Sequence, residues 1–155
     1  MSSTLRTDLL AGAQSARTEL LAAIEGLSDD QMAAPSLDGW SVRDQLAHVA
    51  AWDELRYYEI ARVVRGQPTL YHDLRDDHEV REINGAFTYF RRDLTSEEML
   101  RELEFSRGRI LELVETMPEE RLAEAAEGRV RIRRTAGHDR DHAAQIRDWR
   151  KREGI

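Results

Sequence analysis

The chain has 155 residues and a net formal charge of −7, with 41% hydrophobic and 34% charged residues. This size and balance suit one globular domain over residues 1–155, and no apolar run approaches the roughly 18 residues that a membrane span needs. The chain contains no cysteine, which excludes disulfides, thiolate metal sites and cysteine nucleophiles. The acidic balance argues against nucleic acid as a partner. The N-terminal segment leads straight into an amphipathic pattern and shows no signal-peptide core, so we expect a cytoplasmic protein.

Hydrophobic periodicity is helical over nearly the whole chain. The first helix is expected over residues 3–25 and is followed by a loop at 35–39. The second helix is expected over residues 41–65, with Ser41 and Asp44 capping its first turn. Apolar side chains cover this second helix nearly all round, which predicts a central place in a bundle and would permit a homodimer.

The second half of the chain predicts three further helical stretches. One is expected over residues 77–92 and another from the cap at Thr95 to Pro118, unless the two form one helix broken at 93–95. Residues 123–134 suggest a turn and a short extended segment, and the last helix begins near residue 135. We therefore predict an all-α fold: a four-helix bundle with an additional short helix and a long connection before the last helix.

The last helix carries two histidines one turn apart, His138 and His142. Residues four apart share one face of a helix, and Gln145 and Trp149 continue this face, which should turn inward. Two inward imidazoles at this spacing are what a divalent metal needs from one helix.

A third ligand must come from elsewhere in the chain. His48 lies on a narrow polar stripe of the second helix between two apolar flanks. Taken alone, it is better read as a hydrogen-bonded structural histidine. His72 and His78 compete as ligands because acidic residues surround them, although a solvated loop explains that segment better.

Two motifs together resemble the DinB-like superfamily, the damage-inducible family with metal-binding four-helix bundles of the YfiT type. The first is the segment from Trp40 to His48, and the second is His138-x-x-x-His142-x-x-Gln145-Ile146. The resemblance extends from the first helix to Trp149. It implies a bundle of DinB/YfiT type that holds a divalent metal with His48, His138 and His142. It also implies a family whose members include metal-dependent thiol transferases and a mycothiol-dependent maleylpyruvate isomerase, and whose members often form dimers.

Three imidazole ligands leave a coordination position open, as in catalytic rather than structural metal sites. Zinc or nickel suits such ligands, as do iron and copper. We expect a thiol S-transferase acting on a small molecule, with a low-molecular-weight thiol as co-substrate. The alternatives are a metal-assisted hydrolase at the same site, or a non-catalytic, metal-stabilised bundle that binds a small molecule.

Several polar or aromatic residues are candidates for supporting the ligands or lining a pocket. Arg134 could bind a substrate carboxylate, and Trp149 is the best candidate for a pocket wall. Asp44 is better explained as a helix cap, whereas the sequence favours neither a structural nor a site role for Gln145. The full candidate set is Asp44, Asp53, Asn84, Arg134, Asp141, Gln145 and Trp149.

Overall fold

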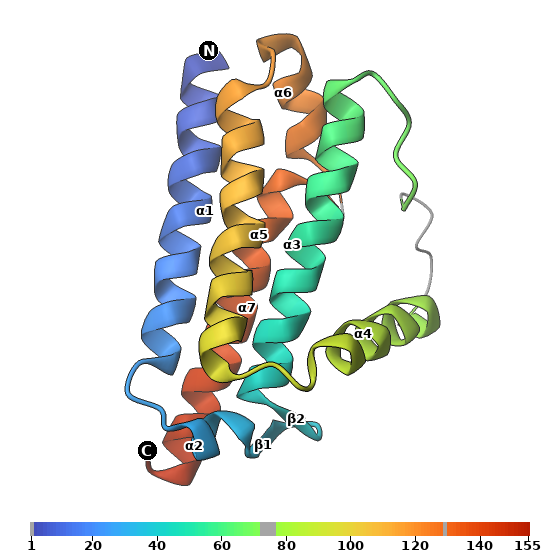
Figure 1. Cartoon of the computed structure of the whole chain (residues 1–155). Helices are drawn as coiled ribbons and strands as arrows, with labels where there is room; N and C mark the ends of the chain where they lie inside the picture. Colours follow the sequence, from blue (N-terminus) through green and yellow to red (C-terminus); the bar gives the residue numbers. More distant parts are fainter. Residues whose placement is uncertain (1, 72–76, 129) are drawn as a thin grey trace.

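The computed structural model describes residues 2–71, 77–128 and 130–155 (Figure 1). His72, one of the two competing ligands, and the acidic residues Asp73 and Asp76 beside it lie outside the described residues.

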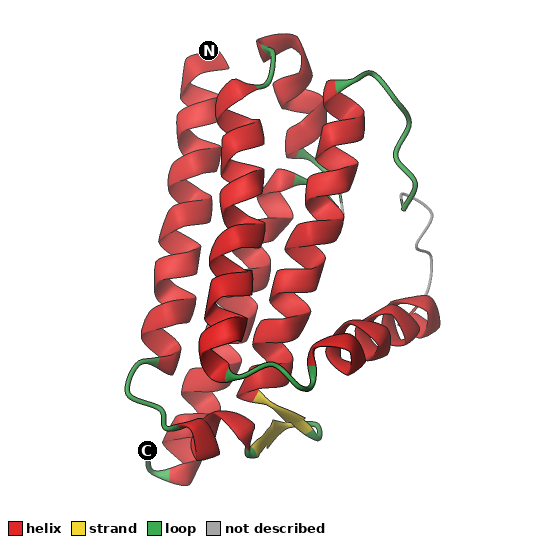
Figure 2. Ribbon diagram, in the orientation of Figure 1, coloured by secondary structure: helices red, strands yellow, loops and turns green. Residues whose placement is uncertain are grey.

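Four long helices lie alongside one another and form the bundle, as Figures 1 and 2 show. They are α1 (Ser2–Ile24), α3 (Val42–Val64), α5 (Ser96–Thr116) and α7 (Ile132–Glu153). The closest packing joins α1 to α7 and α3 to α5. The predicted all-α four-helix bundle is thus confirmed.

Shorter elements connect the long helices. Between α1 and α3 lie α2 (Asp29–Ala33) and a small antiparallel hairpin of β1 (Pro35–Leu37) and β2 (Trp40–Ser41). Helix α4 (Asp77–Arg91) follows α3 and leans away from the bundle (Figure 1). Helix α6 (Glu119–Ala126) lies within the long connection before α7.

The structure corrects the sequence prediction at two points and decides between two alternatives at a third. The expected loop at 35–39 is a hairpin, whose two turn residues, Asp38 and Gly39, both have positive φ angles of 48° and 86°, as tight hairpin turns require. Helices α4 and α5 are separate, which confirms the first of the two alternatives for this segment. The expected extended segment near residue 130 is absent from the described residues, because Val130 is buried against Trp52 without a strand partner.

Helix α3 is the central element, as its apolar surface predicts. Sixteen of its side chains are buried, and Leu46 and Ile60 are completely inaccessible. Its N-terminus has the predicted capping box, in which Ser41 accepts from the amide of Asp44 and the Asp44 carboxylate accepts from the amide of Ser41. The apolar surface that would permit a homodimer is therefore covered largely by other helices of the same chain. None of the helices in the described ranges combines the length and the apolar character that a membrane span requires.

Candidate metal centre

Three histidines from two helices meet in the interior of the bundle. His48 extends from α3, and His138 and His142 extend from α7. Nε2 of His138 lies 2.8 Å from Nε2 of His48 and 3.3 Å from Nε2 of His142. All three side chains are buried, with at most 9% of their surface exposed. Helix α3 places His48 there because the helix is apolar on both flanks of its polar stripe.

The distances between these nitrogens fit a shared metal ion. Zinc–imidazole bonds of about 2.0–2.1 Å in tetrahedral geometry place two ligand nitrogens about 3.3 Å apart, and octahedral geometry places them about 3 Å apart. The two observed separations, 2.8 and 3.3 Å, lie close to these values. The three ligand atoms lie within 4.8 Å of one another, so these histidines could bind a metal.

Burial keeps the three rings in the neutral form that metal binding needs. Burial, together with His142 and the charge of Arg56, lowers the pKa of His48 to about 3. Burial also lowers the pKa of His142 to about 4, although Asp139, Asp141 and Gln145 act in the opposite direction. The pKa of His138 is likewise lowered, first by burial and then by the Arg56 charge.

A glutamine on α3 orients one of these rings. Nδ1 of His142 lies 3.2 Å from Oε1 of Gln45, which can only accept, so this nitrogen donates. The amide of Gln45 is itself held by a hydrogen bond to Ser36 Oγ in β1. Nε2 of His142 is consequently left with its lone pair facing His138, as a metal ligand requires.

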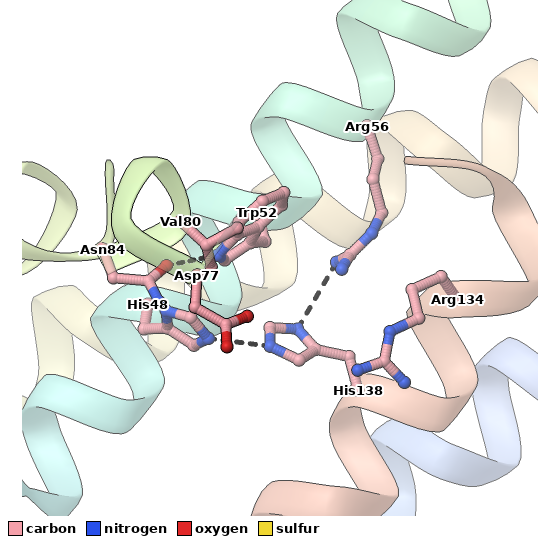
Figure 3. A pocket seen from close by; sticks show the side chains of 8 residues that line it. All are labelled: His48, Trp52, Arg56, Asp77, Val80, Asn84, Arg134 and His138. Carbon is pink, nitrogen blue, oxygen red and sulfur yellow. Dashed lines mark hydrogen bonds between the residues drawn. The ribbon is translucent and has the colours of Figure 1, made fainter. Parts of the chain in front are cut away.

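A cavity of about 250 Å³ opens beside His48 and His138 (Figure 3). Trp52 forms part of its wall, and its indole Nε1 donates to Asn84 Oδ1 of α4 over 2.8 Å. This hydrogen bond holds α4 beside the cavity. Among the described residues, the lining consists of His48, Trp52, Arg56, Asp77, Val80, Asn84, Arg134 and His138.

A network of buried ion pairs lies next to the histidines in the interior of the bundle. Asp53 of α3 and Asp139 of α7 are both completely inaccessible. Arg17 of α1 and Arg107 of α5 each contact both carboxylates, over 2.8 to 3.0 Å. The network joins all four long helices, and it anchors α7 at the residue that follows His138.

The predicted supporting residues have varied locations. Asn84 and Arg134 line the cavity, whereas Asp44 makes the helix cap described above. Asp141 is exposed and pairs with Arg134 over 3.2 Å.

Two further candidates for lining the cavity, and one competing metal ligand, lie away from the cavity. Gln145 is exposed on α7. Trp149 is buried in the core with Leu20 and Leu46 rather than in the cavity wall, because it lies too far along α7. His78 is exposed and lies 3.8 Å from Glu82, so it does not join the three histidines.

Sequence reasoning missed Gln45, Arg56, Arg17, Arg107 and Asp139. A signal was present for some of them. Gln45 precedes His48 by one helical turn, and Arg17 and Arg107 interrupt apolar faces at positions where a hydrophobic residue is expected. A charge on a buried face needs a charged partner.

The sequence model of the DinB superfamily matches residues 13–146. The chain belongs to the DinB superfamily. A comparison with curated protein sequences found no significant match.

Solved structures share the DinB fold at low sequence identity. An uncharacterised protein from Escherichia coli UTI89 has a TM-score of 0.81 and 18% identity, covering 97% of this chain and 95% of the other. The colibactin self-resistance protein ClbS, in complex with dsDNA, has a TM-score of 0.80 and 16% identity, with 94% and 95% covered. DfsB, a sibling lethal factor precursor, has a TM-score of 0.75 and 19% identity, with 96% of each chain covered.

One of these structures corrects a sequence-based prediction. We expected no nucleic-acid partner on the basis of the net charge of −7. That exclusion is wrong, because the structure of ClbS, which has the same fold, contains dsDNA. Net charge averages over the whole molecule and does not rule out a local surface that binds a polyanion.

Proposed function

We propose that this DinB-superfamily chain is a metal-dependent enzyme acting on a small molecule, with His48, His138 and His142 as the metal ligands. The observation that supports this most strongly is the approach of three buried Nε2 atoms beside a cavity of about 250 Å³. We propose zinc or nickel as the metal, since both accept three imidazoles. A divalent metal with an open position, when bound there, lowers the pKa of water or a thiol and so supplies a nucleophile near neutral pH.

For the nucleophile we propose a low-molecular-weight thiol, which makes the reaction an S-transfer. The chain has no cysteine, so a reactive sulfur must come from a second molecule. The thiol loses its proton, its sulfur bonds to an electrophilic carbon of the substrate, and the leaving group departs with the electron pair and takes up a proton. Trp52 and Val80 offer apolar surface for the substrate, and Arg134 offers charge.

Hydrolysis is the second candidate, and one carboxylate favours it. Asp77, the first residue of α4, lines the cavity together with His48 and His138 (Figure 3). A carboxylate in this position can accept a proton from water as the water attacks a substrate. An Asp77→Asn variant should therefore lose hydrolytic activity while keeping thiol transfer, if both occur.

The test compares zinc-loaded and nickel-loaded protein with two histidine variants. Cysteine, glutathione and mycothiol are each incubated with 1-chloro-2,4-dinitrobenzene, and thiol loss is followed over time. Wild type and the exposed-histidine control His78→Ala should consume at least one thiol, and His142→Ala should not. Hydrolysis of a nitrophenyl ester without thiol consumption would favour the hydrolase. Ligand-dependent thermal stabilisation without turnover would favour a binding module.

A further inference from the structure

Counted over the residues that the structure describes, the buried ion network carries one positive charge in excess. It contains three guanidinium groups and two carboxylates, all of them largely inaccessible to solvent. The members are Arg17, Arg56, Arg107, Asp53 and Asp139. An unmatched buried charge is costly unless a counter-ion reaches it.

The excess charge lies at Arg56, on the cavity wall. Arg17 and Arg107 each contact both carboxylates, whereas Arg56 reaches only Asp53, over 3.3 Å. Within the described part of the chain, Nε of Arg56 is buried and has no hydrogen-bond partner. Only 2% of Arg56 is exposed, and burial lowers its pKa to about 10. Its guanidinium points from α3 toward His138 (Figure 3).

A second arginine faces the same cavity. Arg134, from the first turn of α7, lines the wall beside His138. Its side chain is 47% exposed and pairs with Asp141 outside the cavity lining. Of the charged side chains in the described segments, two arginines and one carboxylate, Asp77, therefore border the cavity, in addition to the histidines.

The contact between Arg56 and His138 also calls for an acceptor, an argument that rests on the proposed metal function. Nη1 of Arg56 lies 3.4 Å from Nδ1 of His138. If Nε2 of His138 binds a metal as a neutral imidazole, Nδ1 carries the proton. Two N–H donors then lie next to one another, and an anionic oxygen on the cavity side of the pair would accept from both.

We propose that Arg56, Arg134 and Nδ1–H of His138 form an anion subsite, and that the substrate or co-substrate carries a carboxylate. A carboxylate matches the fork of a guanidinium and the single excess charge. A phosphate dianion would bring a second negative charge toward Asp77, which lines the same cavity.

The experiment measures binding of benzoate by calorimetry, with benzamide as its uncharged counterpart and inorganic phosphate as the competing anion. Arg56→Lys keeps the buried charge beside Asp53 but loses the fork, and Arg134→Gln removes the second charge. Arg147→Gln, at an exposed position of α7, is the matched control. Each protein is measured zinc-loaded and after removal of metal by a chelator.

Benzoate should bind wild type and Arg147→Gln with equal Kd. In Arg56→Lys and Arg134→Gln its Kd should rise by about fivefold to tenfold, and benzamide should bind more weakly than benzoate. Equal Kd in all four proteins, or binding lost on chelation and indifferent to both arginines, would overturn the subsite. Phosphate binding more tightly than benzoate would overturn the carboxylate assignment.

The same measurements distinguish failure of the proposed metal function from failure of the anion subsite. If wild type retains no metal but binds benzoate in an Arg56-dependent manner, the subsite stands and the metal function does not. If metal is bound through the histidines but benzoate ignores Arg56, the metal function stands and the subsite does not.

Discussion

Gln45 of α3 and His142 of α7 meet across the centre of the bundle, with Oε1 of the amide 3.2 Å from Nδ1 of the ring. Gln45 is only 1% exposed, and its amide nitrogen is held by Ser36 of the hairpin over 3.1 Å. The hairpin, which carries no metal ligand itself, therefore holds the amide that sets the proton position on His142. Outer contacts of this kind are known to govern the metal affinity of an imidazole.

Replacing Gln45 with leucine should weaken metal binding while the bundle still folds. The substitution removes the acceptor for Nδ1 of His142 and frees the ring to rotate, so we expect metal affinity to fall by about 10- to 100-fold. Competition with a chromophoric chelator measures this affinity. Gln14→Leu, at an exposed position of α1, should leave it unchanged. Equal affinities for wild type and Gln45→Leu would contradict the role given to Gln45.

The metal-free protein should lose stability as pH falls. Burial lowers the pKa of His48 to about 3 and of His142 to about 4, from an ordinary value of 6.5. Between these values the unfolded chain binds more protons than the folded one, so the free energy of unfolding falls as pH falls. Each ring should contribute roughly 2 kcal/mol of this loss at pH 5.

Urea unfolding in the presence of a chelator, at pH 7.5, 6 and 5, measures this pH dependence. His48→Gln should show a smaller dependence than wild type, whereas His78→Gln, which changes an exposed histidine, should show the same dependence. Wild type and His48→Gln losing stability in parallel would be inconsistent with a buried neutral imidazole at position 48.

Asp139→Asn should destabilise the protein strongly. The carboxylate of Asp139 is inaccessible and pairs with Arg17 and Arg107. Removing its charge leaves those guanidiniums under-compensated in the interior, which costs about 3 kcal/mol or more. Urea unfolding measures the loss. Glu19→Gln, which removes an exposed pair with Arg140, should change little, and a similarly small effect of Asp139→Asn would refute the network.

Asn84→Ala should loosen α4 selectively. No side chain of α4 is fully buried, and the indole of Trp52 donates to Asn84 over 2.8 Å. Few buried contacts make local opening cheap, so losing this bond should speed amide hydrogen exchange in α4 and leave α1 and α5 unchanged. Thr88→Ala, which removes only hydrogen bonds to the helix's own backbone, is the control. Unchanged exchange in α4 would show that Asn84 does not hold it.

The main helices could be predicted because their signals are local. The caps at Ser41 and Thr95 mark two helix starts, and the apolar surface of α3 identifies the central helix. Helix α6 and the start of α7 at Ile132 were missed. At the start of α7, the alternation of Val130 and Ile132 with arginines suggested an extended segment. Burial of Val130 and Ile132 in the tertiary structure, rather than their local pattern, determines the conformation of this segment.

The site could be predicted only in part. The spacing of His138 and His142 indicates a shared helical face. The position of His48 on the polar stripe of α3 does not indicate which residues it meets, so only the family resemblance placed it with the other two histidines. The pairing of Asp53 with Arg107 joins residues 54 positions apart, and no periodicity specifies such a contact. Sequence patterns therefore indicate which residues are unusual, whereas the fold determines which of them meet.

Metal content is the most direct test of the account. Protein purified without a metal-affinity tag is analysed by elemental mass spectrometry, alongside His142→Ala and the exposed-site control His78→Ala. The account predicts one zinc or nickel per chain in wild type and in the control, and loss of the metal in His142→Ala with its helical circular dichroism retained. Metal retained in His142→Ala, or wild type that takes up no divalent metal after reconstitution, would contradict the central claim.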